Sequence, residues 1–369
     1  MTEWIECTLD KLGEIVGGAT PSTKCEDYYG GSIPWITPKD LSSFKGRYIT
    51  SGERNITEKG LASCSAQMMP KDAVLFTSRA PIGYVAIASQ SVCTNQGFKS
   101  IVVNEKADPL FVYYLLKYNK DAIEAMGSGT TFKEVSGKTM RAVKVRIPLD
   151  VSYQNRIAAV LDSLDTKIEN NERINDNLQQ QAQAIYSSMF IDNPDPAWSH
   201  GHLSDLITVK YGKDHKKLAD GIYPVYGSGG IMRYVERPLY NKESVLIPRK
   251  GTLNNVMYVN QPFWSVDTMF YTEMKLPNVA KFVYHFVKAK DLASMNAGSA
   301  VPSMTTDILN AMEVVIPSAS ALEEFESLVA PMYEAMEAND VQSKALSQMR
   351  DTLLPKLMSG EIDVSDIQL

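Results

Sequence analysis

The longest regular pattern of hydrophobic positions predicts two long helices. Between about residues 152 and 190, apolar or small residues step by four and then three positions, and the same stepping recurs 168 residues later. A period of 3.5 residues, sustained over several heptads, is typical of a coiled-coil seam. The first seam comprises Ile157, Leu161, Leu164, Ile168, Asn171, Asn175, Leu178, Ala182, Ile185 and Met189. The second comprises Phe325, Val329, Met332, Met336, Asn339, Ser343, Leu346, Arg350, Leu353 and Leu357.

Asn171 and Asn339 occupy equivalent positions of the two seams. A buried Asn at a seam position commonly fixes the register of a coiled coil at some cost in stability. A locally open, solvated seam would also accommodate these residues. The sequence leaves both interpretations open.

The chain before each long helix shows shorter patterns that predict a mixed α/β module. Apolar runs of strand length, such as residues 73–76 and 84–88, are separated by Gly and Pro turn signals. Single helices are expected at residues 109–119 and 279–289. Each long helix therefore follows a globular module.

The two modules match each other in sequence. Residues 111–117 and 282–288 share four of seven identities, and residues 74–80 match residues 245–251 at the same offset of 171. A third match relates Gly129–Pro148 to Gly298–Pro317 at an offset of 169. The common order and near-constant offset favour a tandem duplication over coincidence.

The predicted fold is α+β, with two mixed α/β modules joined by two long antiparallel coiled-coil helices in a pseudo-twofold tandem repeat. The expected boundaries are 1–150 for the first module, 151–191 for the central helix, 192–317 for the second module, and 318–369 for the C-terminal helix and tail.

The net charge of −6 at first argues against nucleic-acid binding, but the charge is unevenly distributed. Residues 1–150 carry 18 Lys+Arg against 16 Asp+Glu, and residues 192–317 carry 13 against 12. Residues 318–369 carry only 3 against 10. Basic loops that suit phosphate contact include Lys45–Arg47 in the first module and Lys210–Lys217 in the second, although such runs are more often solvated faces.

The sequence contains no recognisable catalytic constellation. Gly137-Lys138-Thr139 resembles the end of a phosphate-binding loop, but Phe132 stands where that motif requires Gly. His200 and His202, which we expect in a linker, have no third metal ligand nearby. Four scattered cysteines, no long apolar stretch and no secretory signal at the N-terminus predict a cytoplasmic protein outside the membrane.

Several short motifs extend over essentially the whole chain. They are Thr20–Ser22, Tyr28–Trp35, Ile56–Leu61, Ser78–Gly83, Thr94–Phe98, Tyr223–Gly230, Arg249–Thr252, Trp264–Thr268, Gln183–Phe190 and Leu353–Ile362. Together these motifs resemble one family, the specificity subunits of type I restriction–modification systems. One departure is Asn254, where the first module has Gly83, so we expect that loop to differ.

The resemblance implies that each module is a target-recognition domain that reads one half of a bipartite, asymmetric site in double-stranded DNA. The helices would set the spacer and dock modification (methyltransferase) subunits, two of them, and a restriction (translocase and nuclease) subunit would join the complex. S-adenosylmethionine, ATP and Mg would act in those partners, and this chain would bind no cofactor and no metal.

Base edges in the major groove are read best by Arg, Lys, Asn and Gln side chains. The candidate DNA-binding residues are Lys39, Arg79, Asn95, Gln96 and Lys133 in the first module, and Lys213, Tyr226, Ser228, Arg249 and Lys250 in the second. Arg79 and Lys250 occupy equivalent positions of the repeat. For Asn95 and Gln96 a structural role in a turn is an equal alternative, and for Tyr226 packing in the core.

Two other functions remain possible on the sequence alone. One is a single-chain DNA methyltransferase or nuclease with a divergent active site, which would bind S-adenosylmethionine or cut DNA by itself. The other is a coiled-coil scaffold that never contacts DNA.

Overall fold

The computed structural model describes residues 2–129, 133–295 and 303–367. The chain divides into two compact units: unit 1 is Met1–Glu172 with Asp340–Leu369, and unit 2 is Arg173–Asn339. Each unit therefore contains one globular module and a stretch of both long helices. The repeat segments that begin at Gly129 and Gly298 lie partly outside the described residues.

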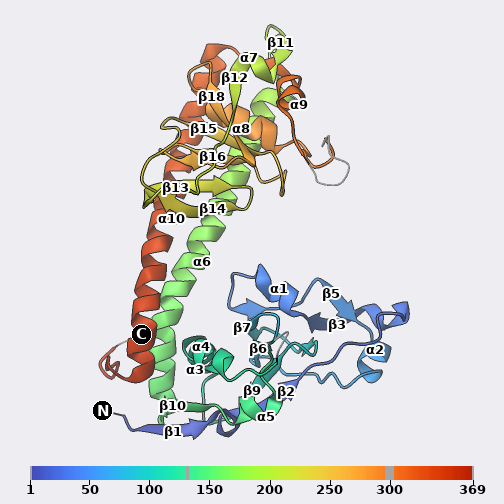
Figure 1. Ribbon diagram of the computed structural model, residues 1–369, viewed down its shortest axis with the longest axis vertical. Helices are drawn as coiled ribbons and strands as arrows, with labels where there is room; N and C mark the ends of the chain where they lie inside the picture. Colours follow the sequence, from blue (N-terminus) through green and yellow to red (C-terminus); the bar gives the residue numbers. More distant parts are fainter. Residues whose placement is uncertain (1, 130–132, 296–302, 368–369) are drawn as a thin grey trace. The chain divides into compact units, whose positions relative to one another are not determined.

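Unit 1 is built on a five-stranded sheet in the order β2-β9-β6-β7-β4. Its strands are β2 (Gly13–Gly17), β4 (Tyr48–Ile49), β6 (Val74–Ser78), β7 (Ile82–Ala88) and β9 (Lys99–Val103). The apolar helix α3 (Pro109–Tyr118) packs on β6 and β7 (Figure 1). Asp108 caps this helix, because its side chain accepts a hydrogen bond from the Phe111 amide.

The remaining elements of unit 1 surround this sheet. A three-stranded sheet has the order β5-β3-β8, and β1 pairs antiparallel with β10. The strands are β1 (Trp4–Thr8), β3 (Tyr29–Ile36), β5 (Arg54–Ile56), β8 (Cys93–Thr94) and β10 (Lys144–Pro148). The short helices are α1 (Pro38–Ser42), α2 (Glu58–Ala62), α4 (Lys120–Ala125) and α5 (Gly137–Arg141).

Unit 2 repeats this topology. Its main sheet has the order β12-β18-β15-β16, a second sheet has the order β14-β13-β17, and β11 pairs antiparallel with β19. The strands are β11 (Ser199–His202), β12 (Ile207–Tyr211), β13 (Asp220–Gly227), β14 (Gly230–Val235), β15 (Ser244–Pro248), β16 (Met257–Val259), β17 (Trp264–Ser265), β18 (Met269–Met274) and β19 (Glu313–Ile316). The helices are α7 (Leu203–Leu206), α8 (Ala280–Lys288) and α9 (Thr306–Asn310).

The loops that follow β6 and β15 show the repeat at residue level. Ala80 and Gly251, which are 171 positions apart, both have positive φ angles, of 47° and 86°. The next residues differ: β7 begins at Ile82, whereas β16 begins only at Met257. The loop expected to differ between the modules is therefore longer in unit 2.

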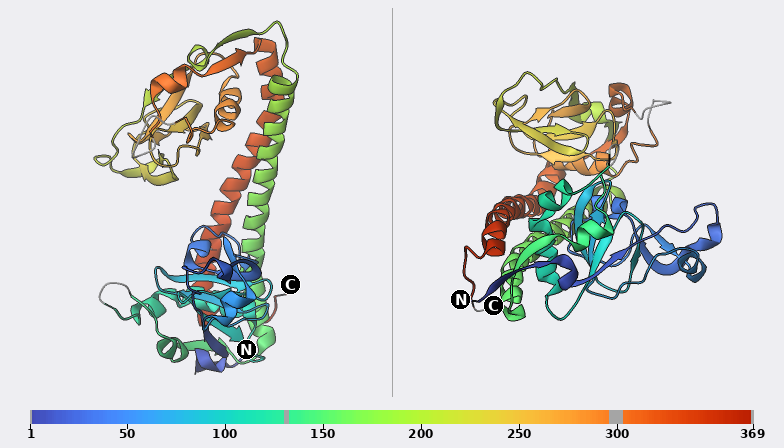
Figure 2. Two further views of the ribbon diagram at one scale, coloured as in Figure 1. Left: turned by 90° about the vertical axis from the view of Figure 1, so that its right-hand side faces the viewer. Right: turned by 60° about the horizontal axis from the view of Figure 1, so that its bottom comes forward.

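The two long helices have the predicted seams. Helix α6 (Val151–Ser187), which continues into a π-helical turn (Ser188–Asp192), and helix α10 (Ala319–Ser359) lie side by side within each unit (Figures 1 and 2). All the seam residues are buried or half-buried. Contacts join Asp165 to Arg350 in unit 1, and Asn175 to Asn339 in unit 2, and the helices run antiparallel. No helix among the described residues is long and apolar enough to cross a membrane.

Each module shares its hydrophobic core with the helices of its unit. In unit 1, side chains of α3 such as Phe111 pack with Ile157 and Leu161 of α6 and with Leu357 of α10. In unit 2, Phe282 of α8 packs with Tyr186 of α6 and Phe325 of α10. Helix and module are therefore one folded body within each unit.

Candidate nucleic-acid interface

Arg79 of unit 1 emerges from the end of the buried strand β6. Its backbone pairs with that of Glu134, which brings exposed Lys133 to the same place. The Arg79 Nη1 atom lies 3.6 Å from Glu134 Oε2, and Lys99 Nζ lies 3.6 Å from Glu134 Oε1. Two cations at a strand end therefore share one carboxylate, with Lys133 beside them.

Unit 2 presents Arg249 and Lys250 at the corresponding strand end, after β15. Arg249 Nη1 donates to the Asp267 carbonyl at 3.2 Å, and its guanidinium lies 5.4 Å from the centre of the Tyr211 ring. Lys250 is exposed, and its backbone pairs with that of Ser303. The Arg249 side chain is therefore held by contacts within unit 2, whereas the Lys250 side chain reaches solvent.

Ser228 lies beside the Arg249–Lys250 loop. A Cβ atom on Gly251 would come within 2.6 Å of Ser228 Oγ, and the φ angle of Gly251 is +86°. The φ angle favours Gly at this position, and the close approach of Ser228 Oγ leaves little room for a side chain. The Ser228 carbonyl also accepts a 2.8 Å hydrogen bond from Asn255. The structure thus brings Ser228, Arg249 and Lys250 together.

Lys39 lies on α1, in a different part of unit 1. Its Nζ is 2.7 Å from Glu53 Oε2, and both side chains are largely exposed. The hydrogen bond and charge of Glu53 raise the pKa of Lys39. The pair borders an open hollow of about 410 Å³ that is also lined by Asp40 and Tyr48.

Three candidates make contacts within their own modules. Asn95 Oδ1 accepts from the Gly97 amide at 2.8 Å, and the Asn95 amide donates to the Ile36 carbonyl at 3.0 Å, as expected for a residue in a turn. Exposed Gln96 accepts a hydrogen bond from Thr20 Oγ1. Tyr226 is 8% exposed and packs edge-on against Phe263.

Lys213 of unit 2 combines a fixed backbone with an exposed side chain. Its carbonyl accepts a 2.8 Å hydrogen bond from the Trp264 indole, and its amide donates to the Ser265 carbonyl at 2.8 Å. The side chain is exposed. Its backbone position is thus set by β17, and its charge is available to a partner.

Asn171 and Asn339 make corresponding contacts across the helix pair. In unit 1, Asn171 is fully buried and its amide group donates to Ser343 Oγ at 3.1 Å and to Gln342 Oε1 at 2.9 Å. In unit 2, Asn339 donates to Asn175 Oδ1 at 2.8 Å. Since Asn175 and Ser343 are themselves 168 positions apart, the same polar layer occurs once in each unit.

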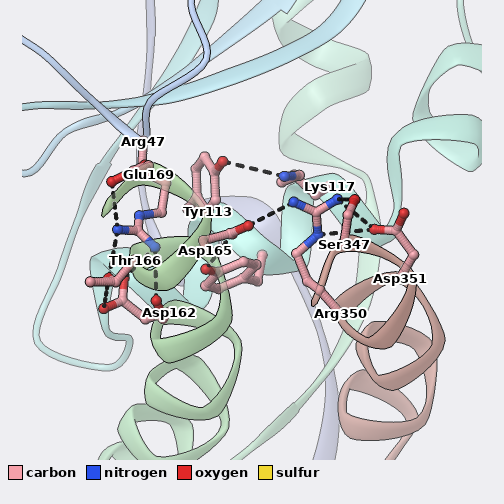
Figure 3. Close-up of polar contacts among 11 residues, drawn as sticks. Arg47, Tyr113, Lys117, Asp162, Asp165, Thr166, Glu169, Ser347, Arg350 and Asp351 are labelled. Atoms are coloured by element: carbon pink, nitrogen blue, oxygen red, sulfur yellow. Dashed lines mark hydrogen bonds and ion pairs between the residues drawn. The ribbon is translucent and has the colours of Figure 1, made fainter. Parts of the chain in front are cut away.

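Arg47, in a loop expected to contact phosphate, has another role. Its side chain is 6% exposed and lies against α6, where it donates to the Asp162 carbonyl at 3.0 Å and to Thr166 Oγ1 at 2.9 Å (Figure 3). It also pairs with Glu169 at 3.1 Å. The expectation was wrong for this residue because its charge is already neutralised inside unit 1.

Arg350 of α10 extends the same junction from the other helix (Figure 3). Its Nη1 lies 2.6 Å from Asp165 Oδ1, and Asp165 Oδ2 accepts a 2.8 Å hydrogen bond from Tyr114 of α3. Burial opposes the charge of Arg350, but hydrogen bonds to Asp165 and Asp351 outweigh it and raise its pKa. Module, α6 and α10 therefore meet at one buried polar network. The sequence held one indication of this network: Arg350 occupies a position of the hydrophobic seam, where a charged side chain needs a partner.

Unit 2 uses neutral groups at the equivalent junction. His285 stands 171 positions after Tyr114 and is fully buried. Its Nδ1 lies 2.8 Å from Gln183 Oε1, and its Nε2 lies 2.9 Å from the Tyr333 hydroxyl. Burial, helped by the charge of Lys288, lowers the pKa of His285 to about 4. A neutral imidazole fits these partners, with Nδ1–H donating to Gln183 and Nε2 accepting from Tyr333.

His200 and His202 lie in strand β11, not in a linker as expected. The pairing of β11 with β19 was not visible in the sequence, because its partner lies more than 100 residues away. Side chains of His202 and Asp205 form a capping box at the start of α7. Among the described residues, no group of three or more His, Cys, Asp or Glu side chains is placed to hold a metal ion.

Comparison with known proteins gives a consistent result. The family model of the type I restriction modification DNA specificity domain matches residues 1–180 and 197–325. The chain is 32% identical to the type I restriction enzyme MjaIX specificity subunit of Methanocaldococcus jannaschii, over 99% of this chain and 95% of that protein. It is 23% identical to the type I restriction enzyme EcoprrI specificity subunit of Escherichia coli, over 90% and 89% of the two chains.

A solved structure shares the fold. The crystal structure of the type I restriction–modification system S subunit from M. genitalium superimposes with a TM-score of 0.63, at 19% identity and with 96% of each chain covered. The predicted α+β architecture of two modules and two long antiparallel helices is thus confirmed. On the domain match and the relative that spans nearly its whole length, the chain belongs to the family of type I restriction–modification specificity subunits.

Proposed function

We propose that this chain is the DNA-recognition subunit of a type I restriction–modification complex, in which each module reads one half of a bipartite, asymmetric site. As a specificity subunit the chain is the non-catalytic component of such a complex. Methylation and cleavage would belong to partner subunits, which would bind S-adenosylmethionine, ATP and Mg.

The main support for this proposal is that both modules place a cation at the end of the same strand, although the residues around that cation differ. Arg79 shares a carboxylate with Lys99, whereas Lys250 is accompanied by Arg249 and Ser303. Equivalent placement supports a common task, since Arg and Lys supply both phosphate contacts and major-groove readout. The different surroundings support different half-sites.

The ten candidate residues divide by their proposed contribution. We propose that the side chains of Lys39, Arg79, Lys133, Lys213, Ser228, Arg249 and Lys250 contact DNA. Gln96, at an exposed turn, would contact a base edge or the backbone nearby. Asn95 and Tyr226 would shape the loops that carry these contacts, because their polar groups and rings are engaged within their own modules.

The long helices are proposed to set the number of base pairs between the half-sites and to dock two modification subunits, and a restriction subunit would join the complex. Residues 318–369 carry 10 Asp+Glu against 3 Lys+Arg, and this acidic excess would keep the C-terminal helix away from DNA and favour a protein partner. The proposed boundaries are 1–150, 151–191, 192–317 and 318–369. A protein that reads cellular or incoming DNA would act in the cytoplasm.

Mapping methylated adenines across the genome tests the proposal. Cells with this gene and the partner genes should carry methyl groups at one bipartite sequence with a fixed spacer. Removing only this gene should abolish methylation at that sequence. Methylation that persists unchanged without the gene would exclude the proposed role.

A further inference from the structure

Glu134 stands between two cations of the proposed DNA-binding surface of unit 1. Its carboxylate lies 3.6 Å from both Arg79 Nη1 and Lys99 Nζ. Both separations exceed ordinary hydrogen-bond lengths, so these ion pairs are loose. The Arg79 and Glu134 side chains are 35% and 40% exposed, whereas Lys99 is 17% exposed, so the pair with Arg79 is the one that another partner exchanges easily.

The backbone of Glu134 is held firmly, in contrast to its side chain. Its amide and carbonyl exchange hydrogen bonds of 2.9 and 3.0 Å with Ser128, and the next amide, Val135, donates to the Ser78 carbonyl at 2.9 Å. The carboxylate is therefore presented at a fixed place beside Arg79. Only the side-chain torsions are left to adjust.

The ion pairs that join the module of unit 1 to its long helices through Arg47 and Arg350 differ in kind. Arg47 and Arg350 meet their carboxylates at 2.6–3.1 Å, with guanidinium side chains that are 6% and 20% exposed. Those pairs are permanent parts of the junction with the helices. The Glu134 pairs have the geometry of a contact that another anion could replace.

The repeat shows that the loop does not require a carboxylate. Ser303 is the equivalent of Glu134, 169 positions later, and it makes the same backbone pairing, with Lys250. The bridge is thus formed with a neutral side chain in unit 2. The charge of Glu134 must serve something other than the architecture of the loop.

We propose that Glu134 is a specificity-determining residue of unit 1, whose carboxylate restrains Arg79 and Lys99 and suppresses binding to DNA that lacks the target sequence. This inference rests on the proposed function. Any duplex offers phosphates to exposed cations, and this contact is independent of sequence. A carboxylate at the same place repels phosphate and occupies the cations. On a target duplex, Arg79 would contact a base edge while it stays paired with Glu134, whereas on any other duplex its contact with phosphate would require the loss of this ion pair.

The test uses the assembled methyltransferase complex and two duplexes, one with the mapped target and one with its bases scrambled. Glu134→Gln should strengthen binding to the scrambled duplex about three- to tenfold, because Arg79 then reaches a phosphate without losing an ion pair. It should leave target binding nearly unchanged, because the ion pair is kept in that complex. The plot of log affinity against log salt for the scrambled duplex should steepen by about one, as one more phosphate is neutralised.

Three further variants make the test specific. Glu6→Gln removes the same charge from an exposed pair with Lys144 on the β1–β10 ribbon and should change neither affinity. Arg79→Ala combined with Glu134→Gln should lose most of the gain, since Arg79 is one of the two cations released. Ser303→Glu should weaken binding of the scrambled duplex through unit 2, by restraining Lys250.

The outcomes are distinct. Unchanged affinity of Glu134→Gln for both duplexes would overturn the inference. Loss of target binding in this variant would also overturn it, because Glu134 would then contribute a favourable base contact or be required for the loop. A wild-type complex that binds both duplexes equally would instead contradict the proposed function itself.

Discussion

At the scale of single residues, Arg79 and Lys250 are proposed to contact DNA from equivalent positions of the two modules. Both follow a buried strand, and both pair through the backbone with an equivalent residue. If either contacts a base, its replacement by Ala should cost about 1–3 kcal/mol of target binding and relax the sequence requirement in one half-site. If it contacts phosphate, the loss should be uniform across sequences and the salt slope should fall by about one. Fluorescence anisotropy of the complex with labelled duplexes measures both.

Lys144→Ala is the matched control, because Lys144 is an exposed cation of the same unit on the β1–β10 ribbon. It should leave target binding within about a factor of two, as expected for an exposed charge distant from the contact. Equal binding by the Arg79→Ala variant and the wild type would remove Arg79 from the proposed interface, and the same holds for Lys250.

The limits of the sequence are also visible at this scale. Arg47 and Arg79 look alike as basic residues near Gly or Ser, yet one is buried and the other half-exposed. The partners of Arg47 lie 115 or more residues away, on α6, so no local pattern distinguishes the two. Tyr226 likewise could be assigned to the core only once Phe263 was placed beside it.

At the scale of elements, the four longest of the described helices were predictable, whereas the short helices and the pairing of the strands were not. The seams of α6 and α10 follow from local periodicity, and α3 and α8 lie within a residue of their predicted ends. Strand order depends on partners distant in sequence. The β1–β10 pair, for example, joins Trp4 to Pro148. The repeat indicated that the two modules would share a topology without indicating which topology.

The junction of α3, α6 and α10 gives a prediction about stability. Asp165 receives hydrogen bonds from both Tyr114 and Arg350, and its side chain is only 9% exposed. Asp165→Ala should destabilise unit 1 by about 3 kcal/mol, because it removes the buried counter-charge of Arg350, which keeps only exposed Asp351, and the acceptor of the Tyr114 hydroxyl. Hydrogen exchange of the full chain, read by mass spectrometry, should show lost protection in residues 151–172 and 340–359.

Glu6→Ala provides the comparison for this junction variant. Glu6 pairs with Lys144 at 3.1 Å, but both side chains are more than 60% exposed, so the pair should contribute well under about 1 kcal/mol. Protection of unit 2 should stay the same in both variants. An Asp165→Ala chain with unchanged exchange in unit 1 would show that the network adds nothing to the packing of the helices.

At the scale of the whole molecule, the charge distribution agrees with the proposal that the modules contact DNA and the helices contact protein partners. The net charge of −6 hides two faintly basic modules, because the acidic excess lies mainly in residues 318–369. Net charge governs association rather than fold. We therefore propose that affinity for duplex DNA comes from local contacts of each module and from partner subunits, and not from the net charge of the whole chain.

Modular readout gives the last prediction. Replacing residues 1–150 by the corresponding module of another family member should change one half of the methylated sequence and leave the other half and the spacer as they were. The donor's equivalents of Asp162, Thr166 and Glu169 must be transferred with the module, because Arg47 pairs with them across the boundary. Exchange of residues 192–317 should alter only the opposite half. Mapping of methylated adenines reports both chimeras, and a single-module exchange that rewrote both halves would show that the two modules do not read DNA independently.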